Sequence, residues 1–111
     1  MTTRFTFATT LLPGREAEYE RVHRVTPTAL DAVIRRAGAR FWRIERNGTR
    51  LFHFVEVDAV DSFDTVLADS AVNADWQQVV GPLLETEPAQ RTIVQSFDFG
   101  QGDLVWELPV R

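Results

Sequence analysis

Residues 39–57 read ARFWRIERNGTRLFHFVEV and carry the strongest hairpin signal of the chain. Their Asn47-Gly48 dipeptide is preferred in the type I′ turns of β-hairpins, where both central residues take a positive φ. The runs before and after this turn are rich in aromatic and β-branched residues, which favour strands. The second run is apolar except at His53 and Glu56, so we expect a central strand that is covered on both faces.

The rest of the chain alternates between strand-like and helix-like patterns around this hairpin. Alternation with a period of two predicts strands, and apolar residues at steps of three and four predict helices. The predicted strands are residues 4–11, 39–46, 51–57 and 92–99, with a last extended piece at 104–108. Helices are predicted to begin near Glu16, at Thr26-Pro27, at Asp61 or Ser62, and at Asn73, and residues 85–90 are predicted to form a polar loop.

Pro27 is predicted to divide the first helical region in two. A proline inside a helix removes a hydrogen-bond donor and clashes with the preceding turn. We therefore expect a break shortly after His23, with Thr26 as the cap of the second piece and Pro27 at its first position. Gly38 follows two arginines and is expected to end this piece in a left-handed conformation.

The resulting order of elements is β-α-β-β-α-β, with the second helical region also divided. This order predicts an α+β fold of the ferredoxin-like split βαβ type, in which helices cover one face of an antiparallel sheet. One domain is expected for residues 1–111, because the chain is too short for two. The other sheet face would carry apolar and aromatic residues, and a second copy is its simplest cover. We therefore expect a homodimer with the architecture of a dimeric α+β barrel.

The composition excludes several classes of partner. With a net charge of -4 and a pI of about 5.1, the chain lacks the basic stripe that nucleic acids and anionic membranes require. It has no cysteine, which excludes disulfides, thiolate metal ligands and cysteine nucleophiles. Neither an apolar run of about 18 residues nor a signal-peptide pattern is found. We expect a soluble cytoplasmic protein.

Tyr19 and His23 are the first candidates for chemistry. They stand four residues apart in the first predicted helix, so their side chains lie on the same helix face. The imidazole of histidine has an unperturbed pKa near neutrality, which suits proton transfer. Because every helix supplies pairs at this spacing, an amphipathic surface helix with a solvated histidine is the alternative interpretation.

Five segments together resemble the L-rhamnose mutarotase family, and they do so in register along nearly the whole chain. They are YERVH (residues 19–23), GARFW (38–42), LFHFVEV (51–57), NADWQ (73–77) and VWELP (105–109). The length and the order of elements agree as well. The chain is identified as a divergent member of this family, within the dimeric α+β barrel superfamily.

The resemblance implies which residues form the site. A family histidine one turn beyond a tyrosine transfers protons, and this places the catalytic roles on His23 and Tyr19. A ring residue on a strand and a pair of tryptophans on the later helix hold the sugar in the family. The matching positions are Trp42, Trp76 and Gln77, where the first replaces a tyrosine and the last replaces a tryptophan of typical members.

The activity implied by the resemblance is that of an aldose mutarotase. Such an enzyme interconverts the α and β anomers of L-rhamnose, or of a related deoxyhexose, by opening and reclosing the cyclic hemiacetal. Both steps move protons between oxygens, so neither a metal nor a redox cofactor is expected. The expected partner is a small molecule, either a monosaccharide or another small ring compound.

Two residues of the hairpin leave alternatives open. His53 stands where relatives usually have a small residue, and it is either a histidine accommodated within the sheet or, if it faces the pocket, a second acid–base group that binds substrate. Glu45, with Arg43 two residues before it, is interpreted as part of an exposed cross-strand ladder.

Other functions also remain open at the level of the sequence. Dimeric α+β barrels with apolar pockets are also similar to cofactor-independent monooxygenases and polyketide-type cyclases. Trp42, Val25 and Pro27 in place of polar sugar contacts would suit a hydrophobic or aromatic substrate of such a tailoring enzyme. A non-catalytic binding module would be favoured if His23 were exposed on the outer surface of its helix. An iron site made of His23, His53 and a carboxylate is disfavoured, because Glu56 should point away from His53.

Overall fold

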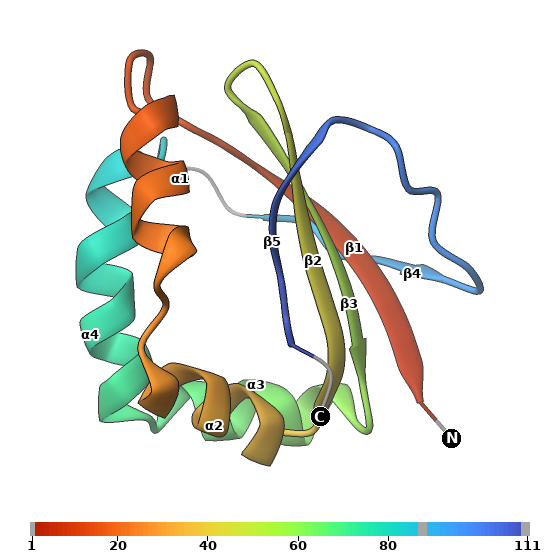
Figure 1. Ribbon diagram of the computed structural model, residues 1–111. Helices are drawn as coiled ribbons and strands as arrows, with labels where there is room; N and C mark the ends of the chain where they lie inside the picture. Colours follow the sequence, from red (N-terminus) through yellow and green to blue (C-terminus); the bar gives the residue numbers. More distant parts are fainter. Residues whose placement is uncertain (1, 87–88, 110–111) are drawn as a thin grey trace.

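The computed structural model describes residues 2–86 and 89–109. Within this part of the chain, an antiparallel sheet is covered by helices on one side, as Figure 1 shows. The elements in chain order are β1 (Thr3–Thr10), α1 (Glu16–Arg24), α2 (Thr28–Arg36), β2 (Ala39–Asn47), β3 (Arg50–Val57), α3 (Val60–Ala68), α4 (Ala71–Val80), the 3-10 turn η1 (Gly81–Leu83), β4 (Thr92–Val94) and β5 (Asp103–Glu107). Glu87 and Pro88 of the predicted polar loop lie outside the described residues.

The sheet confirms the ferredoxin-like prediction. Its strand order is β4-β1-β3-β2-β5, and β5 extends the four-stranded ferredoxin-like order at the outer edge of β2. The predicted hairpin joins β2 to β3, but its turn is formed by Gly48 and Thr49, because Asn47 still pairs with Arg50 at the end of β2. Gly48 has a φ of 61°, whereas Asn47 does not take the positive φ expected of a type I′ turn. As predicted, β3 lies at the centre of the sheet between β1 and β2.

The core lies between the helices and the sheet face that they cover. Strand alternation turns Phe5, Ile44 and Val55 toward the helices, where each side chain is almost fully buried. The helices contribute apolar residues at helical spacing, such as Leu30 and Ile34 of α2, which pack in the same cluster as Phe5 and Val55. Helices α1 and α4 therefore lie over this face of the sheet.

The predicted break after His23 is present between α1 and α2. The predicted start of α2 was one residue too early, because Pro27 occupies the capping position and the helix begins at Thr28. The extended ψ of 134° at Pro27 turns its carbonyl toward the helix, where it accepts hydrogen bonds from the amides of Leu30 and Asp31. Gly38 ends the segment with a φ of 101°, as expected for a left-handed residue.

The later helices begin earlier than predicted. Helix α3 begins at Val60 rather than after a cap at Asp61 or Ser62, and no side chain caps it. Helix α4 begins at Ala71, because the Ser70 hydroxyl accepts a hydrogen bond from the amide of Asn73 and acts as the N-cap. The amide of Asn73 is therefore the capped group, and the residue lies inside the helix.

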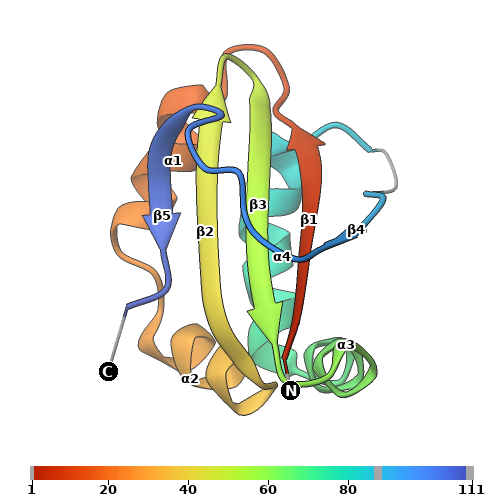
Figure 2. The same cartoon turned by 90° about the vertical axis from the view of Figure 1, so that its right-hand side faces the viewer.

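The predicted strand 92–99 is wrong beyond Val94. Strand β4 pairs with β1 over three residues only, and the chain then crosses the open sheet face to reach β5 at the opposite edge (Figure 2). Phe97 and Phe99 drive this departure, since their rings pack on Phe41 and Phe54, which project from the open face. We call residues 95–102 the crossing segment.

Glu45 is not part of an exposed ladder, and this prediction was wrong. Its side chain is fully buried, and its carboxylate accepts hydrogen bonds from the backbone amides of Gly100, Gln101 and Gly102. The guanidinium of Arg43 donates a further hydrogen bond at 2.8 Å. Burial raises the pKa of Glu45, but these donors outweigh that effect and hold it below its ordinary value. These hydrogen bonds link the end of the crossing segment to β2.

Candidate active site

A cavity of about 190 Å³ lies between the helices and the covered face of the sheet. All six residues singled out from the sequence line it, although they come from four different elements. They are Tyr19 and His23 of α1, Trp42 of β2, His53 of β3, and Trp76 and Gln77 of α4. The helix break shapes its rim, because Thr26 also lines the cavity.

His23 is buried and is held by a hydrogen bond to its own helix. Its side chain is only 5% exposed, and Nδ1 lies 2.8 Å from the carbonyl oxygen of Tyr19. A carbonyl oxygen can only accept, so Nδ1 carries the proton and Nε2 keeps its lone pair. Burial lowers the pKa of His23, while the hydrogen bond to the Tyr19 carbonyl opposes that shift. The imidazole is therefore neutral near pH 7 and has one nitrogen ready to accept a proton.

Tyr19 supports this imidazole from one turn earlier in α1. The two rings stack with their centroids 4.2 Å apart, and the tyrosine side chain is 3% exposed. Burial raises the pKa of the Tyr19 phenol, which keeps it protonated throughout the neutral range. The phenol is thus a fixed neutral wall beside the base and a possible hydrogen-bond donor, never an anion.

His53 faces the cavity and is not merely enclosed by the sheet. Trp42 Nε1 lies 3.2 Å from His53 Nδ1, and His53 Nε2 lies 3.3 Å from the hydroxyl of Thr9. The ring of Phe7 stacks on the imidazole at 4.2 Å. Burial, together with the nearby His23, lowers the pKa of His53 to about 3. This imidazole therefore stays uncharged and contributes hydrogen bonds rather than a titrating proton.

Indole rings form much of the remaining wall. Trp76 and Trp106 each meet the ring of His23 edge-on, at centroid distances of 5.2 and 6.4 Å. Flat apolar rings of this kind suit the C–H faces of a sugar or another small ring. Gln77 lies at the exposed rim, where its amide donates to the side chain of Asn73.

Several residues that line the cavity were not singled out from the sequence, among them Thr9, Asn73 as a polar group, and Trp106. Alternation along the first strand places Thr9 on the same face as Phe5 and Phe7, and this signal was available. Trp106 could be placed only once β5 was known to pair with β2, where it lies opposite Ile44.

The metal arrangement considered from the sequence does not form. His53 and Glu56 lie on opposite faces of β3, and Glu56 instead pairs with Arg4 at 2.9 Å. Among residues 2–86 and 89–109, no group of three or more histidines and carboxylates is placed to hold a metal ion.

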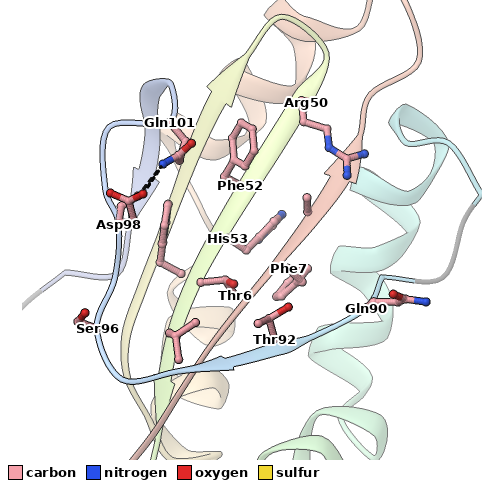
Figure 3. A pocket seen from close by; sticks show the side chains of 13 residues that line it. Thr6, Phe7, Arg50, Phe52, His53, Gln90, Thr92, Ser96, Asp98 and Gln101 are labelled. Atoms are coloured by element: carbon pink, nitrogen blue, oxygen red, sulfur yellow. Dashed lines mark hydrogen bonds between the residues drawn. The ribbon is translucent and has the colours of Figure 1, made fainter.

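A second hollow, of about 580 Å³, lies on the opposite side of the sheet beneath the crossing segment. Figure 3 shows its side chains, with Thr6 and Phe52 projecting from the open face and Gln101 joined to Asp98 on the crossing segment. Phe7 and His53 line both this hollow and the cavity that contains His23. In the described residues, no helix is both long and apolar enough to cross a membrane.

Solved structures with this fold include both mutarotases and monooxygenase-like proteins. An L-rhamnose mutarotase from Formosa agariphila is 16% identical, with a TM-score of 0.67 over 88% of this chain and 98% of that chain. A candidate antibiotic biosynthesis monooxygenase from Bordetella bronchiseptica is 24% identical, with a TM-score of 0.65 over 86% and 97%. A NIPSNAP-like domain protein from Burkholderia xenovorans is 13% identical, with a TM-score of 0.63 over 95% and 94%. At these identities the similarity establishes the fold alone.

The sequence itself distinguishes among these groups. No curated protein sequence matches the chain. The model of the L-rhamnose mutarotase family, in contrast, matches residues 4–108 and so includes every residue that lines the cavity. The chain therefore belongs to the L-rhamnose mutarotase family.

Proposed function

We propose that this protein is a cytoplasmic sugar mutarotase that interconverts the α and β anomers of L-rhamnose or a related deoxyhexose. The observation that carries the proposal is the orientation of His23, whose Nδ1 lies 2.8 Å from the Tyr19 carbonyl oxygen and whose side chain lines a cavity walled by indole rings. Family membership supplies the reaction class, and Tyr19 holds the base in position.

The chemistry needs one base placed beside the anomeric carbon. His23 Nε2 takes the proton of the anomeric hydroxyl, the electron pair left on that oxygen forms the aldehyde C=O, and the bond from C1 to the ring oxygen breaks. The imidazolium then gives the same proton to the ring oxygen. Rotation about C1–C2 and the reverse steps close the ring on the other aldehyde face, so no proton is gained or lost overall.

The size of the cavity favours a small substrate. A volume of about 190 Å³ is below the range of about 300–1,000 Å³ that is usual for drug-sized ligands. A monosaccharide matches this space better than a polycyclic aromatic compound. The phenol of Tyr19 and the rim amides of Asn73 and Gln77 provide polar partners for sugar hydroxyls.

The direct test is saturation-transfer NMR between the two anomers of L-rhamnose, L-fucose and D-glucose, with and without the purified protein. Faster exchange for one of the 6-deoxy sugars is the expected result. Exchange at the uncatalysed rate for all the sugars would contradict the proposal.

A tailoring enzyme that acts on a hydrophobic or aromatic ring is the second candidate. It is favoured by the lining of the cavity, in which the described residues include no lysine, arginine or carboxylate to hold a highly hydroxylated sugar. The fold is shared with monooxygenase-like proteins as well. Binding of small phenols, but of no sugar, in the same NMR samples would favour this candidate over the first.

The proposed base predicts an acid-tolerant enzyme. Since burial lowers the pKa of His23, the neutral and active form should persist below the ordinary imidazole value of about 6.5. We expect the acidic limb of the kcat/KM profile to have its midpoint below that value, as measured by anomer exchange from pH 4.5 to 8. A midpoint at or above 6.5 would show that the base is solvated or is another group.

We further propose that a second copy of the chain covers the open face of the sheet. Phe99 of the crossing segment is 48% exposed, and Phe52 lines the 580 Å³ hollow beside it. An exposed aromatic ring beside a hollow with mixed polar and apolar lining is compatible with an interface between subunits. Light scattering should give the mass of two 12.6 kDa chains.

Phe52→Glu should convert this dimer to a folded monomer, because it places a charge in the centre of the proposed interface. The matched control is Val79→Glu, which places the same charge at an exposed apolar residue of α4 and should leave the dimer intact. A wild-type protein that is monomeric at micromolar concentration would contradict the proposal.

A further inference from the structure

A chain of hydrogen bonds crosses the floor of the cavity from strand to strand. It begins at Trp42 on β2, passes through His53 on β3 and ends at Thr9 on β1. The direction of the chain is fixed at its first member, because an indole N–H can donate a hydrogen bond but cannot accept one. His53 Nδ1 must therefore be the acceptor.

The later members follow from this first step. A neutral imidazole with an accepting Nδ1 carries its proton on Nε2, so His53 donates to the hydroxyl of Thr9. The 3.3 Å distance leaves this bond long enough to adjust when a ligand binds. Having accepted from His53, the hydroxyl must direct its own proton elsewhere. Thr9 lines the cavity, and within the described residues its side chain makes no other hydrogen bond.

On the helix side of the cavity, the group available to a ligand is a hydrogen-bond acceptor instead of a donor. There the Tyr19 carbonyl fixes the proton on His23 Nδ1 and leaves Nε2 as an acceptor. The cavity thus offers an acceptor on the helix side and a donor on the sheet side. A cyclic hemiacetal has the complementary pair on two oxygens bonded to the same carbon, because its anomeric hydroxyl donates while its ring oxygen can only accept.

We propose that the Trp42–His53–Thr9 chain ends in a hydroxyl donor that holds the ring oxygen of the substrate, opposite the base His23. This inference rests on the proposed mutarotase function and adds the group that receives the leaving oxygen. Thr9 is the catalytic residue of the chain, since it contacts the substrate. Trp42 and His53 act through it as positioning residues, in addition to lining the cavity.

The role of Thr9 in the reaction is to stabilise charge. When the C1–O bond breaks, its electron pair moves to the ring oxygen, and negative charge grows there until the proton arrives from His23. A donor already pointing at that oxygen strengthens its hydrogen bond as the charge develops. Thr9 keeps its own proton throughout, so the balance of the mutarotase reaction is unchanged.

The test uses three threonine variants in the anomer-exchange assay. Thr9→Val keeps the shape and removes the hydroxyl, and kcat should fall by about tenfold or more with a smaller change in KM. Thr9→Ser restores a hydroxyl and should recover most of the rate. Thr3→Val makes the same change on the same face of β1 but away from the cavity, and it should leave the rate unchanged. A wild-type rate in Thr9→Val would overturn the inference while the proposed function stands.

A spectroscopic test does not depend on activity. Long-range ¹H–¹⁵N correlation of the imidazole rings should show His53 neutral and protonated at Nε2 from pH 5 to 8 in the wild-type protein. Trp42→Phe removes the indole donor and should let the other tautomer or the charged form appear. If the wild-type ring is protonated at Nδ1 or is charged at pH 6, the chain runs the other way and the inference fails. This result remains informative even if no sugar is turned over.

Discussion

Replacing His23 with alanine should lower the rate of anomer exchange by about 10²–10⁴-fold, the contribution expected of a positioned general acid–base group. The loss should appear in kcat, because Nε2 acts on the proton that moves in the transition state while the indole walls still bind the ring. Saturation-transfer NMR at saturating sugar measures this directly. Circular dichroism should show that the variant remains folded.

The control lies one residue along the same helix. Arg24 is exposed on α1, and Arg24→Ala alters the helix without touching the cavity. It should exchange anomers at the wild-type rate. Equal rates in His23→Ala and the wild type would remove the imidazole from the mechanism, even if the protein proved to be a mutarotase.

The second large effect is expected at Gly102, where the crossing segment joins β5. A Cβ atom built there would lie 2.2 Å from the carbonyl oxygen and 2.4 Å from the carbonyl carbon of Arg46. Because both of these atoms belong to the backbone, β5 would have to move away from β2. Gly102→Ala should therefore lower the free energy of unfolding by about 3 kcal/mol or more, as measured by urea denaturation.

Gly81→Ala is the matched control for this substitution. Its added Cβ meets no atom of a sequence-distant residue within 4 Å, and only the neighbouring Pro82 disfavours a helical alanine there, so the free energy of unfolding should fall by no more than about 1 kcal/mol. An equal and small effect of both alanines would show that the close approach of residues 46 and 102 is absent in solution.

Glu45 fastens the same junction, and its contribution should depend on pH. Its pKa is depressed in the folded state, so the stabilisation is fully present above the unfolded value of about 4.3 and is lost as the pH falls through the folded value. Glu45→Gln should lower the free energy of unfolding by about 2 kcal/mol at pH 7 and by less at pH 3. Urea denaturation at both pH values checks this. A pH-independent loss would contradict the role of the charge.

Local signals were enough to predict the main sheet and the helix break. Gly48 tolerates the positive φ that the hairpin turn requires, and Pro27 cannot continue a helix, so each residue restricts its own conformation. The alternation around Phe97 and Phe99 was misleading, because a strand and an aromatic segment lying across a sheet share the same period. Only their packing on Phe54, far away in the sequence, separates the two.

The residues of the candidate site could likewise be predicted from the sequence only in part. The pair Tyr19 and His23 was visible because helical spacing alone brings it together. The burial of Glu45 could not be predicted, since all its partners except Arg43 lie more than fifty residues away and are backbone amides that any sequence provides. The protonation state of His53 likewise depended on which group of Trp42 the fold presents to it.

The tautomer of each histidine is fixed by its neighbour, because the Tyr19 carbonyl can only accept a hydrogen bond and the Trp42 indole can only donate one. We therefore expect the cavity to favour one orientation of a bound ligand over the reverse. In the proposed binding mode the anomeric hydroxyl of a free sugar meets His23, whereas a pose that exchanges this hydroxyl with the ring oxygen would set lone pair against lone pair at Nε2. A methyl glycoside has lost the hydroxyl proton that the base requires, so it should bind weakly in either direction. The Tyr19 carbonyl and the Trp42 indole would thus let the cavity distinguish a reducing sugar from its methyl glycoside without any charged group.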